Sequence, residues 1–438
     1  MNRRSVGLGL GALAALPLVA RPAFAASPRP QAAEVFDIWY RLVLELVRHT
    51  PTYSPPVASR AFAYLGVTGF EAVQMTGPGL RSLSGQMPGF GPVPRDSGPL
   101  DPPLVLHAAL AQAVRRYFGN TGPTGQRAMA ALTKQLGARL AEGLGQTVLD
   151  ASVRQGEAVA AHVFGWSQTD GGAQIENMGF PMAYKRPEAP GSWVPTSLIV
   201  QQQAPLLPLW GENRAFAMPQ NDACGLPPPP AYSEVPGSPF HAEAEEVFAV
   251  SQRLTDEDRA IARFWSDDPM VSPTPPGHWI SIALQVLKAE AADAARRAEV
   301  LAVLGVALAD AFIACWRAKF EVNLLRPVTY IRKHLDPQWE SLLTTPPFPE
   351  YPSGHSTQSA AAAAVLTDYF GENYRFTDHT HEADGLPART FGSFHHAAAE
   401  AGISRLYGGI HFRSAIVRGL EQGACVGAFA TALRTRAA

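Results

Sequence analysis

The chain has 438 residues, a formal net charge of −2 and charged side chains at only 17% of its positions. This near-neutral balance gives no reason to expect nucleic acid as a partner, because phosphate backbones are bound by basic surfaces. Three cysteines, Cys224, Cys315 and Cys425, are too few for a disulfide framework, and the sequence does not show whether any two of them pair.

The beginning of the chain has the pattern of a secretory signal peptide. Arg3 and Arg4 precede an apolar stretch, and Ala23 and Ala25 follow it with the spacing of a signal-peptidase site. This pattern predicts cleavage after Ala25, although a retained membrane anchor is the alternative. The arginine pair would also permit twin-arginine export. We therefore expect an exported protein, periplasmic or secreted, and leave residues 1–25 out of the fold.

Apolar side chains at three- and four-residue spacing predict helices along most of the remaining chain. An irregular stretch, 167–236, interrupts them, and a loop of that length usually has a function. Alternating strand patterns are nearly absent. We therefore expect an all-α protein of two packed helical bundles with long ordered loops, an N-terminal region over 26–236 and a C-terminal bundle over 237–438. The predicted helices cover 34–50, 55–75, 104–118, 124–143, 148–165, 238–267, 277–290, 293–325, 354–370, 389–408 and 412–434.

The most apolar stretch after the signal peptide is VLAVLGVALADAFIACW, residues 300–316. It is shorter than the roughly 20 residues that a membrane-spanning helix needs, and it contains Asp310. We expect a buried core helix here and no membrane span in the mature chain.

Two basic side chains lie in the segment KFEVNLLRP. Lys319 and Arg326 are seven residues apart, which at about 100° per residue places both on one face of a helix. Pro327 is expected to end that helix and leave Arg326 at its tip. A solvated basic face would explain the same spacing.

The segment FPEYPSGHST, residues 348–357, precedes a run of alanines. A helix that starts near Ser353 would leave its first N–H groups and its positive dipole end open to an anion. Gly354 would let the backbone come close, and His355 would supply an acid or a base. The alternative is a simple helix cap followed by a chance histidine.

A third segment, SRLYGGIHF, places Arg405 six residues before His411. Each of the three segments is weak evidence by itself. Together they offer three cations, a hydroxyl group, an open helix end and two histidines, which is a suitable cradle for a tetrahedral oxyanion.

The order K-x6-RP, then PSGH, then SR-x5-H resembles the vanadium-dependent haloperoxidases. These enzymes share a fold and an anion site with the type-2 phosphatidic-acid phosphatases and the bacterial class A acid phosphatases. The motifs cover residues 319–412, and a looser likeness through PPGHW (275–279) and GSWVPT…PLWG (191–211) extends over most of the mature chain.

The resemblance implies a vanadate cofactor, with hydrogen peroxide, halide and a small organic acceptor as reactants and hypohalous acid as product. It implies that His411 would bond to vanadium and that His355 would act as acid and base on the opposite side. The residues that would hold the vanadate oxygens are Lys319, Arg326, Ser353, Gly354 and Arg405.

The same residues would also serve other functions. In a phosphatase, His411 would attack phosphorus and His355 would protonate the leaving alcohol. A non-catalytic periplasmic oxyanion-binding protein is a further alternative, although binding alone would not need both histidines. The length of the chain favours the haloperoxidase branch. Ala415 stands where the family often has an aspartate, four residues after the metal-bound histidine, and the lack of that carboxylate counts more against a histidine nucleophile than against a metal ligand.

Trp316 and Phe348 match aromatic positions on the halide side of the resembling enzymes, although both could be ordinary core residues. In the family, phenylalanine at the second position tends to accompany chloride oxidation, and histidine tends to accompany bromide oxidation. The sequence gives neither the preferred halide nor the oligomeric state.

Two further polar motifs have no assigned chemistry. His278 lies in PPGHW, at a recurrent position of the family. The segment DHTHEAD could bind a divalent metal ion, form a polar loop or line the entrance to the site. Its candidate ligands are Asp378, His379, His381, Glu382 and Asp384.

Overall fold

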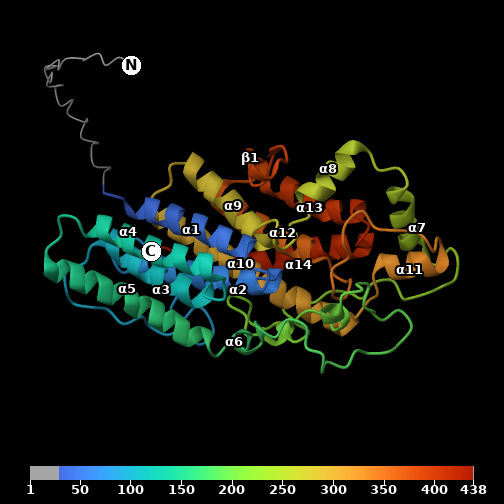
Figure 1. The fold of residues 1–438 in the computed structure, drawn as a ribbon, viewed down its shortest axis with the longest axis horizontal. Helices are drawn as coiled ribbons and strands as arrows, with labels where there is room; N and C mark the ends of the chain where they lie inside the picture. Colours follow the sequence, from blue (N-terminus) through green and yellow to red (C-terminus); the bar gives the residue numbers. More distant parts are fainter. Residues whose placement is uncertain (1–28, 438) are drawn as a thin grey trace, which may run out of the picture.

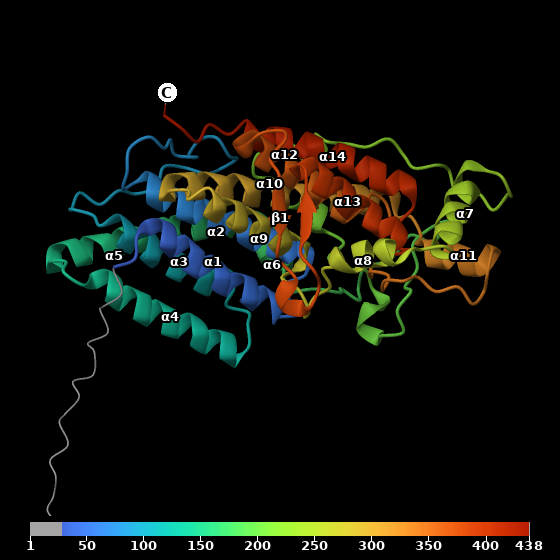
Figure 2. The same cartoon turned by 90° about the horizontal axis from the view of Figure 1, so that it is seen from above.

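The computed structural model describes residues 29–437, so the predicted signal peptide lies outside the described residues. The fold is mostly α-helical with little strand, as predicted, and the molecule is elongated, with most helices running along its long axis (Figures 1 and 2). The α-helices are α1 (Ala32–Arg48), α2 (Pro55–Gln74), α3 (Pro102–Tyr117), α4 (Pro123–Ala141), α5 (Gln146–Ser167), α6 (Gly172–Ile175), α7 (Pro239–Ser251), α8 (Asp256–Phe264), α9 (Thr274–Ala289), α10 (Ala294–Val322), α11 (Pro327–His334), α12 (Gly354–Phe370), α13 (Phe394–Tyr407) and α14 (Arg413–Thr431). Short 3-10 helices occur at Val200–Gln203, Trp210–Glu212 and Glu382–Asp384.

The long helix α10 forms the centre of the molecule. It packs against α2 on one side and against α12 and α14 on another, so it joins the two groups of helices (Figure 1). A Cβ atom at Gly66 of α2 would lie 2.6 Å from the Leu301 carbonyl, and one at Gly305 of α10 would lie 2.8 Å from the Phe62 carbonyl. Only glycine therefore allows these two backbones to approach so closely. The boundary between 26–236 and 237–438 stays a prediction.

The apolar stretch 300–316 is a core helix, as predicted. Among the described residues, α10 is long and apolar enough to cross a membrane by length and composition, but its apolar part is wholly buried in the protein. Neighbouring helices therefore surround it.

The cations Lys319 and Arg326 do not share one helix, so that prediction is wrong. Helix α10 ends at Val322 because Asn323 takes a left-handed conformation with φ of 51°. Arg326 is the N-cap of α11, and Pro327 occupies its first turn, where a missing N–H costs nothing. The proline therefore begins a helix instead of ending one.

Two other predicted helices differ from the structure. The range 238–267 contains two helices, because Thr255 and Asp258 form a capping box that starts α8. The range 389–408 begins with strand β2 (Arg389–Phe391), which pairs antiparallel with β1 (Phe376–Asp378). Strands of three residues are too short to show an alternating pattern.

The long segment 167–236 wraps around the C-terminal helices. The carboxylate of Asp310 on α10 accepts hydrogen bonds of 2.7, 2.8 and 3.0 Å from three consecutive N–H groups at 216–218. A disulfide between Cys224 and Cys425 ties the segment to α14. The pairing that the sequence left open is therefore this one, and the segment is an anchored part of the fold.

Candidate oxyanion site

A cavity of about 410 Å³ brings the predicted motifs together. Apolar side chains and prolines form most of its wall. Three of the predicted residues, Lys319, Arg326 and Ser353, are buried behind the wall with no measurable exposure. The other six line the cavity, and they are Trp316, Phe348, Gly354, His355, Arg405 and His411.

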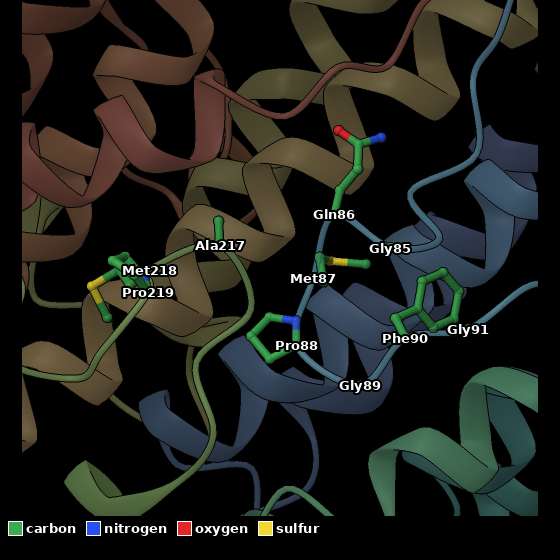
Figure 3. A pocket seen from close by; sticks show the side chains of 10 residues that line it. All are labelled: Gly85, Gln86, Met87, Pro88, Gly89, Phe90, Gly91, Ala217, Met218 and Pro219. Carbon is green, nitrogen blue, oxygen red and sulfur yellow. The ribbon is translucent and has the colours of Figure 1, made fainter.

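A larger surface hollow of about 650 Å³ lies elsewhere, between residues 85–91 and 217–219 (Figure 3). The residues that line it include glycine, proline, methionine and one phenylalanine, with Gln86 as the polar side chain. No titratable group is present among these described lining residues. The hollow therefore lacks acid–base chemistry, and the smaller cavity is the candidate site.

Arg326 and Arg405 approach the cavity from different elements. Arg326 donates through Nε to the Phe348 carbonyl at 2.9 Å and through Nη1 to the Ile410 carbonyl at 2.9 Å. Arg405 donates through Nη2 to the Trp265 carbonyl at 2.6 Å. Burial lowers the pKa of each guanidinium to about 10, which leaves both charged at neutral pH.

Lys319 has a structural role in addition to the anion contact that the resemblance predicts. Its ammonium group donates to the carbonyls of Pro349 at 2.9 Å, Glu350 at 2.9 Å and Pro352 at 2.5 Å. An ammonium has three protons, so these bonds use all of them. Lys319 thus braces the segment before α12 and adds positive charge, while its direct contact with an anion stays a prediction. Burial lowers its pKa to about 8.

Helix α12 begins at Gly354, as predicted from the PSGH motif. Ser353 is its N-cap, and the hydroxyl oxygen accepts a hydrogen bond from the Ser356 N–H at 3.3 Å. Among residues 29–437 the Ser353 hydroxyl accepts this bond and donates none, so its proton is available to a ligand. The first N–H groups of a helix have no intrahelical acceptor, so the start of α12 suits an anion.

His411 is buried and His355 is partly buried, and the two histidines differ in their partners. His355 Nε2 has no hydrogen-bond partner among residues 29–437, and the Trp265 backbone acts to raise the pKa of the ring. Burial, followed by the charge of Arg405, holds the pKa of His355 well below its usual value. His355 is therefore neutral and presents Nε2 as a proton acceptor.

His411 is held in one tautomer. Its Nδ1 donates to Oε1 of Glu350 at 2.8 Å, and its Nε2 accepts from Arg326 Nη1 at 3.1 Å. Burial, Arg326 and Lys319 hold the pKa of His411 well below its usual value. The lone pair therefore lies on Nε2, the nitrogen that a metal or a phosphorus atom would need.

Glu350 is the site residue that the sequence analysis missed. Its side chain is completely buried, and Oε1 also accepts the N–H of Phe412 at 2.9 Å. Burial raises its pKa to about 8, although the charges of Arg326 and Lys319 oppose the shift. The expectation from Ala415 that His411 lacks a carboxylate partner is wrong, because the carboxylate comes from the segment before α12.

The predicted halide-side aromatics are neighbours. The ring centroids of Trp316 and Phe348 lie 4.9 Å apart, and both side chains line the cavity. The Phe348 ring faces two cations, with Lys319 Nζ at 5.2 Å and the Arg326 guanidinium at 5.0 Å from its centroid. One apolar wall therefore separates the cations from the open part of the cavity.

The arrangement fits a bound oxyanion. Three buried cations gather here: His411 lies between Arg326 and the Glu350 carboxyl group, and Asp267 and Asp268 line the cavity near Arg405. Arg326 Nη2 and His355 Nε2 are buried polar atoms that find no partner within the described part of the chain. Buried polar atoms are normally paired, so these two indicate where a ligand would bind.

The motif residues without assigned chemistry also come together. His278 contacts Asp267 and Asp378, and His381 contacts Asp267. Asp267 lines the cavity, whereas His379 and Glu382 form an exposed pair. Ligand atoms of Asp267, His278 and His381 lie within 4.8 Å of one another, and divalent metal binding by this group stays a prediction.

Two comparisons match part of the chain in sequence. A family model described as "VCPO second helical-bundle domain" matches residues 299–437. The chain is also similar to "Vanadium chloroperoxidase" from Curvularia inaequalis, with 34% identity over 88 residues. That alignment covers 17% of this chain and 14% of the chloroperoxidase, so only a small part of that relative is matched.

Solved structures extend the likeness over nearly the whole chain. A structure described as "the first bacterial vanadium dependant iodoperoxidase" matches with a TM-score of 0.85 and 37% identity, covering 94% of this chain and 99% of that one. Apo-type and holo-type structures of a bacterial vanadium-dependent chloroperoxidase match with TM-scores of 0.67 and 0.66. Their identities are 16% and 17%, they cover 88% of this chain, and they share its fold.

Proposed function

The chain belongs to the vanadium haloperoxidase family, whose members are peroxidases, and we propose that it uses hydrogen peroxide to oxidise halide to hypohalous acid at a bound vanadate. The observation that carries the proposal is the state of His411. Its Nε2 lone pair is fixed by the Glu350 hydrogen bond on Nδ1 and lies among three buried cations. A neutral imidazole in that tautomer suits bonding to a metal oxyanion.

The cradle would hold vanadate through charge and hydrogen bonds. Arg326 has a free Nη2, Arg405 lines the cavity, and Ser353 and Gly354 form the open start of α12. We assign His411 as the vanadium ligand and Lys319 as a further source of positive charge. When bound, vanadate would supply the Lewis acidity that activates hydrogen peroxide toward halide.

His355 would handle protons at this site. His355 lines the cavity and its Nε2 is unpaired within the described residues, so the neutral ring would accept a proton from hydrogen peroxide and return it to the oxygen that leaves. The three cations would stabilise the negative charge that develops on oxygen during the reaction. Because the wall of the cavity is mostly apolar, water screens these charges less than it would at an open surface.

We propose iodide and bromide as substrates. The 37% identical relative is described as an iodoperoxidase, which supports iodide for this chain. Chloride is the hardest of the three to oxidise, and the wall of Trp316 and Phe348 is the feature that would help by excluding water from it. We also propose a small organic acceptor, because a volume of about 410 Å³ is much larger than peroxide and halide require.

Export from the cytoplasm is part of the proposal. Residues 1–25 have the pattern of a signal peptide, and the Cys224–Cys425 disulfide is typical of an oxidising compartment. We therefore propose a periplasmic or secreted location.

One preparation tests the function. Vanadate-free protein should show no halide oxidation with hydrogen peroxide, and added orthovanadate should produce it with iodide and bromide. His355→Ala should bind vanadate and lose most of this turnover. Failure of vanadate to restore halide oxidation at any pH would overturn the proposal.

The same geometry suits a second reaction. His411 with a carboxylate on Nδ1 resembles an activated histidine nucleophile, so vanadate-free protein could transfer phosphoryl groups through a phosphohistidine. The comparisons do not favour this alternative. Rapid hydrolysis of phosphomonoesters without vanadate, combined with no halide oxidation in its presence, would favour it over the haloperoxidase.

A further inference from the structure

A buried network of carboxylate and imidazole side chains lies next to the candidate site. His278 Nδ1 is 3.0 Å from both carboxylate oxygens of Asp267, and its Nε2 is 2.7 Å from Asp378 Oδ2. His381 Nε2 lies 3.1 Å from Asp267 Oδ1. The His278 ring has no exposed surface, so these contacts are shielded from water.

This network of side chains is connected to the candidate oxyanion site through the backbone around Trp265. The Trp265 carbonyl accepts a hydrogen bond from Arg405 Nη2 at 2.6 Å, and the Trp265 backbone also acts on the pKa of the His355 ring. Asp267 follows two residues later, in a left-handed conformation with φ of 50° that costs energy for a residue with a side chain. The surrounding contacts must therefore hold Asp267 in place.

His278 makes two independent contacts with this segment. It binds the Asp267 carboxylate, and its ring stacks on the Trp265 ring with centroids 4.5 Å apart and planes inclined by 23°. Asp378 anchors the far side of His278 and is itself tied to Thr380 and to Gln285. Residues of the PPGHW and DHTHEAD motifs thus fix the position of the segment that carries the Trp265 carbonyl.

We infer that His278 is a positioning residue, which fixes the Trp265 carbonyl through Asp267 and the Trp265 ring and thereby orients Arg405 and His355. The inference rests on the proposed function only for the expected loss of halide oxidation. The effect of His278 on oxyanion binding can be measured without vanadate or peroxide.

The protonation state of the group supports this role. A neutral imidazole donates from one nitrogen, whereas His278 faces a carboxylate on each side and must donate from both. Asp267 and Asp378 raise the pKa of His278 to about 10 in spite of its burial. The polar groups beyond them are His381, Asp384 and Arg48, whose contacts extend from Asp267 to the surface.

The test compares two buried histidines. His278→Gln leaves one donor nitrogen where there were two, so it cannot reach both carboxylates, and His107→Gln is the matched control. His107 is also buried beside a tryptophan, with ring centroids 5.7 Å apart from Trp39, and it contacts the Thr133 carbonyl far from the cavity. Calorimetry with inorganic phosphate would report oxyanion affinity, and unfolding midpoints would report stability.

We expect His278→Gln to weaken phosphate binding by about 10- to 100-fold, the usual range for loss of a group that orients ligand-contacting residues. Halide oxidation should fall with it, whereas His107→Gln should keep both. Asp378→Asn keeps an acceptor for His278 and should give a smaller loss of phosphate affinity. This variant serves as the test if His278→Gln does not fold.

Three results would overturn the inference. One is an equal change of phosphate affinity in His278→Gln and His107→Gln, which would reduce His278 to a stability role. Another is wild-type phosphate affinity in the folded Asp378→Asn variant. The third is one equivalent of divalent metal in purified protein, because Asp267, His278 and His381 would then be held by the ion. Phosphate binding without halide oxidation would instead contradict the proposed function alone.

Discussion

Glu350→Gln should weaken vanadate binding relative to phosphate binding. The substitution preserves shape, and its amide oxygen can still accept from His411 Nδ1 and from the Phe412 N–H, since both bonds go to one oxygen in the native side chain. The other carboxylate oxygen has no partner among the residues that the structure describes, so a new NH₂ group there breaks no bond. Burial raises the pKa of Glu350 to about 8, so the comparison is made at about pH 9, where the side chain is charged and the change removes charge and little else.

Two effects of that change oppose each other. Loss of a negative charge should strengthen the attraction for any oxyanion, by roughly 2 kcal/mol for unit charges about 8 Å apart at an effective dielectric constant of about 20. Replacing a charge-assisted hydrogen bond with a neutral one should make His411 a poorer ligand by about 1–1.5 kcal/mol. The absolute affinity for vanadate is therefore a poor test of whether Glu350 tunes His411, because the two effects nearly cancel.

The ratio of two affinities separates them. Vanadate and phosphate share shape and nearly share charge, so the electrostatic gain cancels in the ratio, while only vanadate bonds to His411. We expect the ratio of vanadate to phosphate Kd to rise by about 5- to 15-fold, which is 1–1.5 kcal/mol. Calorimetry with both anions on one preparation would measure it.

The control is Glu71→Gln, because Glu71 is equally buried and accepts the Leu83 N–H at 2.8 Å far from the cavity. It should leave the ratio unchanged. An unchanged ratio in a folded Glu350→Gln variant would refute the reasoning that Glu350 tunes His411.

His411→Ala should lose vanadate affinity, whereas His355→Ala should keep it and lose most turnover; equal loss of vanadate in equilibrium dialysis would show the roles are wrong. Phe348→His should lower chloride oxidation more than bromide oxidation, because imidazole would hydrate the apolar wall, and an unchanged ratio of steady-state rates would mean that Phe348 only packs. Burial raises the pKa of Asp310 to about 6, so the folded state binds the proton more tightly than the unfolded state, and the free energy of unfolding should fall by about 3 kcal/mol as the pH rises from about 4 to 6. Asp310→Asn should lack that part of the slope in urea titrations at several pH values, and an unchanged slope would contradict the assignment.

The sequence was sufficient for the parts of the site that local patterns determine. The start of α12 follows from a serine cap before a glycine and a run of alanines, and the structure confirms it at Gly354. The buried character of 300–316 follows from its composition and is also confirmed. Both features depend on neighbours in the chain, which the sequence displays directly.

The parts that were missed depend on contacts across the chain. The turn at Asn323 rests on a left-handed conformation that is uncommon outside glycine, so helical spacing alone extended α10 to Arg326. Glu350 and His411 are 61 residues apart, and no local pattern pairs them. A lone acidic residue in the apolar, proline-rich run FPEYP was the available signal, because a charge in such a place needs a partner.

The glycines that let α2 and α10 touch have a consequence for how the protein can be produced. A polypeptide restricted to residues 237–438 would keep every proposed oxyanion-binding residue, yet it would expose the flank of α10 that Gly66 and its neighbours normally cover. Such a half-length product should aggregate when expressed alone and become soluble when the first half is supplied as a separate chain. The first half of the chain has no proposed oxyanion-binding residue, yet it covers α10, the helix that carries Lys319. It would therefore act as an intramolecular chaperone for residues 237–438.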